Sequence, residues 1–63
     1  MIKVQFDIDG ENIKTIDMKS VPRVGEYIGI MSEEIKVYKV LEVLWLAYGI
    51  QVNNVSIELE EIK

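Results

Sequence analysis

The sequence predicts an all-β domain with five strands in a strongly bent antiparallel sheet or a small barrel. Three observations lead to this fold class. Apolar and polar residues alternate near both ends of the chain, as they do in half-buried strands. Residues that favour turns separate the alternating runs. β-branched and aromatic residues dominate the middle of the chain, and these residue types favour strands.

The chain length limits how much core the protein can build. Its 63 residues are expected to form one domain, residues 1–63. A domain of this size buries only about 60% of its unfolded surface. Apolar residues make up 49% of the chain, which is ordinary for a globular domain. A few well-placed side chains must therefore supply the core.

The first strand has a regular alternation. Its apolar side chains occupy every second position: Ile2, Val4, Phe6 and Ile8. Asp9-Gly10 follows at once, and Asp-Gly between alternating runs is a strong hairpin signal because both residues tolerate positive φ.

The second strand is expected from about residue 11 to residue 19. Its apolar alternation changes phase between Ile13 and Ile16. A bulge near Lys14-Thr15, or a strong bend, explains this break. The alternative is that Ile13 faces a second layer.

A connection and a short third strand come next. Pro22 fixes its own φ, and Gly25 permits a backbone conformation that is costly for other residues. The run 26–30 then predicts a strand with Ile28 and Ile30 facing inward.

Residues 33–48 allow two interpretations. Ser32 with two glutamates after it, and Gly49 at the other end, are typical of a helix over about 33–48. The abundance of β-branched and aromatic residues favours a long strand instead. With a bulge near Leu41-Glu42, such a strand places four residues on one face: Tyr38, Val40, Val43 and Trp45. The strand is preferred, and Trp45 is then expected in the core.

The last strand alternates clearly. Asn53-Asn54 predicts a turn, and the apolar residues after it follow a period of two: Val55, Ile57 and Leu59. These three side chains are expected to face the core.

The residue types argue against catalysis. The chain has no cysteine and no histidine, so it lacks thiolate ligands, the commonest metal ligand and the commonest general base. No serine or threonine has a partner that would activate it. The protein is therefore expected not to be an enzyme and to hold no cofactor and no metal. No small-molecule substrate is evident.

The charge pattern argues against nucleic acid as a partner. The net charge is −4, and the seven basic residues are dispersed singly along the chain. Binding to a phosphate backbone usually requires several cations on one face.

The acidic residues gather at 33–34 and 58–61, where a solvated face and tail are expected. An acidic patch that docks on a basic partner is the alternative. Asp7, Asp9 and Glu11 alternate around the first hairpin, but the rest of a calcium loop is missing, so a plain turn is expected there.

The sequence predicts a cytoplasmic protein without a membrane segment. Its start alternates and carries an acid at Asp7, unlike a signal peptide. The longest apolar stretch, residues 43–50, is too short to span a membrane.

Apolar residues after position 43 exceed what the core can hold. Some of residues 44–50 should therefore be exposed, and exposed apolar clusters often mark contact surfaces. The candidate partner-binding residues are Leu46, Tyr48, Ile50 and Val52. The alternative is that they cap an open end of the barrel.

Several spaced residues carry a resemblance to a known group. The segments are Pro22-Arg23-Val24-Gly25-Glu26-Tyr27-Ile28, Tyr38-Lys39-Val40, Val43-Leu44-Trp45 and Val55-Ser56-Ile57-Glu58-Leu59. With them the chain resembles small uncharacterised proteins of Gram-positive bacteria and their phages. The resemblance implies an SH3-like small barrel and a mobile-element origin, and it assigns no activity and no functional residue. The chain departs from the group in a more apolar segment at 46–52.

Three function hypotheses follow. The first is a non-enzymatic protein–protein interaction module or accessory factor of a phage or mobile element. The second is a homo-oligomer whose role is assembly. The third is single-stranded nucleic-acid binding with Tyr27, Tyr38 and Trp45 stacking on bases, which the negative net charge opposes.

Overall fold

The computed structural model describes residues 1–31, 33–48 and 51–62, and of residues 47–48 and 51–53 it describes the backbone alone. The described residues form five strands: β1 (Ile2–Ile8), β2 (Glu11–Met18), β3 (Tyr27–Met31), β4 (Ile35–Tyr48) and β5 (Gln51–Glu61). This confirms the predicted all-β class. The alternative of a helix at about 33–48 is wrong, because β4 occupies that stretch.

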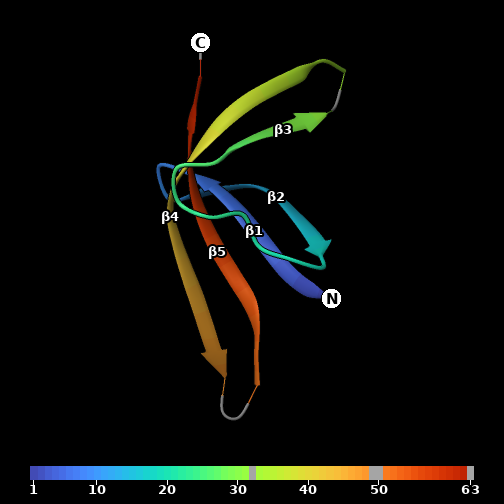
Figure 1. Cartoon of the computed structure of the whole chain (residues 1–63), viewed down its shortest axis with the longest axis vertical. Helices are drawn as coiled ribbons and strands as arrows, with labels where there is room; N and C mark the ends of the chain where they lie inside the picture. The colour runs from blue at the N-terminus through green and yellow to red at the C-terminus, as the bar shows by residue number, and fades with distance from the viewer. Residues whose placement is uncertain (32, 49–50, 63) are drawn as a thin grey trace.

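The five strands form one sheet in the order β2-β1-β5-β4-β3, which curls into a half-barrel (Figure 1). Among the described residues, the end strands β2 and β3 do not pair with each other, so the sheet stays open. We call the face that carries the core the inner face, and the opposite one the outer face. The molecule is elongated, 39 × 20 × 20 Å, with the β4–β5 hairpin extending towards one end (Figure 1).

One pairing departs from the antiparallel sheet expected from the sequence. β1 and β5 run parallel, from Lys3 opposite Asn54 to Asp7 opposite Glu58, while the other three pairings are antiparallel. The connection after β2 brings the chain to the far edge of the sheet, and β5 then enters between β4 and β1. Alternation shows which side chains share a face, but it does not encode strand direction.

The first hairpin has the predicted two-residue turn. Ile8 pairs with Glu11, and both residues between them have positive φ, 53° at Asp9 and 80° at Gly10. These values match a type I′ turn, whose twist suits the flanking strands.

The second strand contains a bulge close to the predicted place. Phe6 pairs with Lys14 and Asp7 pairs with Asn12, so Ile13 is the extra residue. Ile13 is 42% exposed, and the strands of the described residues form one sheet with no second layer against Ile13.

The bulge predicted near Leu41-Glu42 is also confirmed. Val40 pairs with Leu59 and Glu42 pairs with Glu58, which leaves Leu41 without a partner on β5. The extra residue resets the alternation of β4. Val43 and Trp45 thereby face the same side as Val40.

The turn predicted at Asn53-Asn54 is wrong. Both residues lie within β5, and Asn54 pairs with Leu46 of β4. The two strands continue pairing as far as Tyr48 opposite Gln51. The long register of the β4–β5 hairpin overrides the local preference of asparagine for turns.

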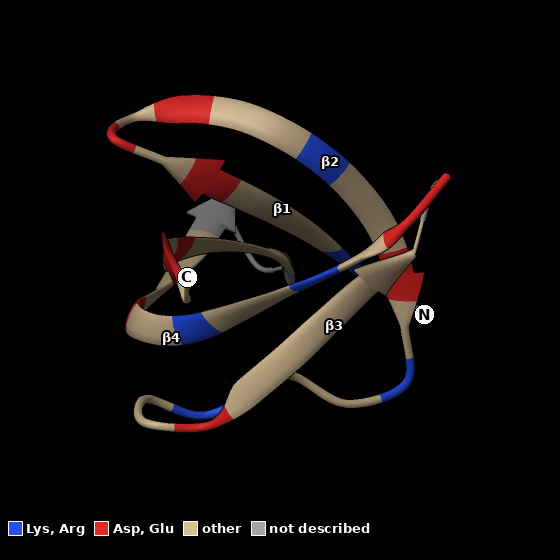
Figure 2. Ribbon diagram, turned by 90° about the horizontal axis from the view of Figure 1, so that it is seen from above, with Lys and Arg blue, Asp and Glu red and all other residues tan. Residues whose placement is uncertain are grey.

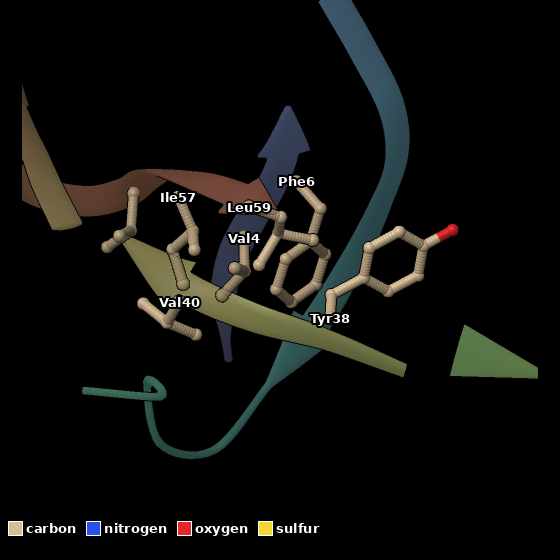
Figure 3. Packing of buried hydrophobic residues seen from close by; sticks show 7 residues of the cluster. Val4, Phe6, Tyr38, Val40, Ile57 and Leu59 are labelled. Carbon is tan, nitrogen blue, oxygen red and sulfur yellow. The ribbon is translucent and has the colours of Figure 1, made fainter. Parts of the chain in front are cut away.

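Among the side chains that the structure describes, seven are buried and form the core, and all come from β1, β4 and β5: Val4, Phe6, Tyr38, Val40, Val55, Ile57 and Leu59 (Figure 3). The inward prediction for the last strand is confirmed at all three positions. Ile28 and Ile30 of β3 are half-buried and pack against this core, also as predicted. The three central strands therefore carry most of the packing.

Phe6→Ala should lower the free energy of unfolding by about 3–5 kcal/mol, because Phe6 is fully buried and its removal leaves a cavity. A domain of this size has a total stability of only about 3–9 kcal/mol, so the variant is expected to be largely unfolded. Chemical denaturation followed by circular dichroism measures the loss.

Leu41→Ala is the matched control, since this apolar side chain is 44% exposed at the bulge. Its cost should stay within about 0.5 kcal/mol. Equal losses from the two variants would contradict the core described above.

Candidate functional site

An open apolar groove lies on the inner face, at the base of the β4–β5 hairpin. Its volume is about 540 Å³. Three parts of the chain line it: the start of β1, the connection between β2 and β3, and the middle of β4. The lining residues are Ile2, Ser20, Val21, Pro22, Arg23, Val24, Val43 and Trp45.

Trp45 is half-exposed in this groove, so its predicted place in the core is wrong. It lies opposite Val55 on the inner side of the sheet, yet 48% of its surface is accessible. The pairing of β1 with β5 begins at Lys3 opposite Asn54, so Trp45 lies where β1 starts. The connection between β2 and β3 covers Trp45 only in part, so about half of this side chain stays exposed.

Backbone hydrogen bonds attach the wall of the groove to β4. The N–H of Gly25 donates to the carbonyl of Val40 (2.9 Å), and the N–H of Val40 donates to the carbonyl of Glu26 (2.9 Å). The φ of Gly25 is 93°, a conformation that favours glycine. The Glu26 carboxylate also accepts from the N–H of Arg23. These bonds fix the position of the neighbouring Pro22.

Of the four predicted partner-binding residues, Leu46 alone has a described side chain, and it does not line the groove. Leu46 is half-buried and, by alternation from Trp45, belongs to the outer face. Tyr48 and Val52 lie on β4 and β5, where only the backbone is described, and Ile50 lies outside the described residues. Sequence reasoning missed the groove, and the shift of phase at the Leu41 bulge was the signal for it.

The three aromatic residues considered for base stacking do not form one exposed surface. Tyr27 is 64% exposed on the outer face, since its neighbour Ile28 packs against the core. Tyr38 is 7% exposed in the core, and Trp45 lies in the groove. The structure brings no two of them together as a stacking platform.

A row of carboxylates crosses the outer face. Asp7 of β1 lies opposite Glu58 of β5, and Glu58 lies opposite Glu42 of β4. Acidic positions on these strands are red in Figure 2. Ser56 Oγ donates to Asp7 Oδ2 (2.9 Å), and the N–H of Gly10 donates to Glu58 Oε1 (3.2 Å). These bonds satisfy individual oxygens but leave like charges side by side.

Within the described part of the chain, no three acidic, histidine or cysteine side chains form a group that could hold a metal ion. The described elements also include no helix that could cross a membrane. In the groove, Ser20 and Arg23 supply the only polar side chains of the lining. The arrangement suits binding of an apolar group with a carboxylate beside it.

Comparison with known proteins gives no relative: no family model, no curated protein and no solved structure matches the chain.

Glu42→Lys should raise the free energy of unfolding by about 0.5 kcal/mol, because it replaces a like-charge neighbour of Glu58 with an opposite one. Urea denaturation at low salt measures the gain. At about 1 M salt the Debye length falls to about 3 Å, and the gain should shrink.

Glu60→Lys is the control, since Glu60 lies opposite Lys39 and the change removes an attractive pair. Both variants replace one acid by lysine, so they alter the net charge equally. A gain from both would mean that net charge, rather than the row of carboxylates, sets the effect.

Proposed function

We propose that the protein is a non-enzymatic interaction module that binds an extended apolar segment of a partner protein in the groove beside Trp45. The single observation that carries this proposal is the half-exposed indole in a groove whose other walls are mostly apolar. Tryptophan and arginine are the residue types most enriched at energetically important interface positions. Here Trp45 and Arg23 line the same groove.

The size and polarity of the groove favour a peptide over a small molecule. A volume of about 540 Å³ is large enough for a few side chains. Small-molecule sites usually enclose most of the ligand's surface, whereas this groove is open to solvent. This lining supplies two polar side chains, and Arg23 alone is charged. The ligand we propose is an apolar side chain with an acidic residue close by in the partner's sequence.

The wider setting of this function is also a proposal. An accessory protein of a phage or mobile element acts by binding other proteins, and a small domain with an open apolar groove suits that role. The chain contains no cysteine, which fits the cytoplasm, where disulfides are rare.

Trp45 provides a direct reporter, because it is the only tryptophan of the chain. Peptides selected from a randomised display library should combine apolar residues with an acid, and they should shift Trp45 fluorescence to shorter wavelength as water leaves the indole. Trp45→Ala should weaken the selected peptides at least about tenfold, as expected for a hot spot. Isothermal titration calorimetry measures the affinity of this variant.

Leu44→Ala is the matched control. Leu44 precedes Trp45 in β4 and is 54% exposed, but it faces the outer side. The Leu44→Ala variant should bind the selected peptides with the same affinity as the wild type. Arg23→Gln should reduce the preference for acidic peptides. No enrichment of peptides, or equal losses from Leu44→Ala and Trp45→Ala, would refute the groove as the binding site.

A further inference from the structure

The two edges of the sheet differ in how they are protected against pairing with another chain. Exposed edges commonly carry charges, prolines or bulges that prevent such pairing. β2 has these features, with Glu11, Lys14 and Asp17 along the strand and the bulge at Ile13. β3, at the opposite edge, reads Tyr-Ile-Gly-Ile-Met from Tyr27 to Met31 and has none of them.

The free side of β3 presents the backbone groups of three residues. The N–H of Val40 donates to the carbonyl of Glu26, and the pairs between β3 and β4 continue in regular register from there. In an antiparallel ladder, every second residue points its N–H and C=O to the neighbouring strand. Ile28 and Ile30 therefore point to β4. The residues whose groups point away from β4 are Tyr27, Gly29 and Met31.

We infer that this edge pairs with the same edge of a second copy of the chain, in an antiparallel arrangement whose two-fold axis lies midway between Gly29 and the partner's Gly29. In this register the backbone groups of Gly29 face those of the partner's Gly29. Those of Tyr27 face the partner's Met31. All three outward residues of each strand are then hydrogen-bonded.

The side chains match in the same register. On the outer face Tyr27 lies opposite the partner's Met31, an aromatic–sulfur contact of a favourable kind. On the inner face Ile28 lies opposite the partner's Ile30. No charged residue occurs at any of the five positions, so the pairing brings no like charges together. A two-fold interface requires a surface that complements itself. In this register β3 complements the partner's β3 along its whole length.

The adjoining outer face adds to the interface. Tyr27 (64%), Met31 (69%) and Ile35 (63%) are strongly exposed apolar side chains, and Met31 pairs directly with Ile35. This apolar patch lies beside the proposed two-fold axis. The connection at residues 20–23 lines both the Trp45 groove and a hollow beside Tyr27 and Ile28. The two proposals are therefore tested by different variants, Gly29→Lys for the dimer and Trp45→Ala for peptide binding.

The experiment measures mass by light scattering and sedimentation equilibrium over about 10 μM to about 1 mM, the range of weak interfaces. The wild type should convert from monomer to dimer as concentration rises. Gly29→Lys should remain monomeric, since it places two ammonium groups at the two-fold axis. The fold accommodates the change, because a Cβ at Gly29 meets Ile35 Cγ2 at an ordinary 3.5 Å.

Val37→Lys is the matched control, because Val37 is the cross-strand neighbour of Gly29 on the same face but not on the edge. It should still dimerise. Gly29→Cys tests the register, since the chain has no other cysteine. Mild oxidation should yield a covalent dimer from this variant and none from Lys14→Cys on β2. A wild type that stays monomeric throughout, or a Gly29→Lys variant that dimerises like the wild type, overturns the proposal.

Discussion

The extra residue at Leu41 is the local constraint on which the rest of the structure depends. Along an extended strand, a shift of one position turns every later side chain to the opposite face. Because Leu41 has no partner on β5, Val40 and Val43 both face inward, opposite Leu59 and Ile57. Without the bulge, the alternation of β4 would turn Glu42 towards the core and Val43 and Trp45 towards the outer face. The core would then contain a carboxylate, and Trp45 would not face the groove.

The groove follows from the different lengths of the central strands. β4 has 14 residues and β5 has 11, whereas β1 has seven. The longer pair therefore extends beyond the shorter strand, and the apolar inner side continues past the well-covered core. Trp45 lies at this boundary, with the Pro22 connection as the opposing wall. The difference in strand length that lowers the burial of Trp45 also creates a surface suited to a partner.

The sequence predicts the strands well because their patterns are local. Alternation identifies β1 and β5, Asp9-Gly10 identifies the first turn, and a change of phase identifies the bulges at Ile13 and Leu41. It fails where neighbours distant in the chain decide the outcome. The parallel direction of β5, its extension through Asn54 and the exposure of Trp45 all depend on which strand lies alongside. The groove beside Trp45 was not predicted from the sequence for the same reason.

The parallel pairing of β1 with β5 has a consequence for how the chain acquires its structure. Val4 and Val55 are adjacent in the sheet, yet about 50 residues separate them, and closing so long a loop costs entropy before contacts repay it. Folding that depends on such distant contacts is slow. During synthesis on the ribosome, β1 and β2 can form their hairpin early, but the core remains incomplete until β5 has emerged. Until then the apolar inner face stays open to chaperones and to aggregation.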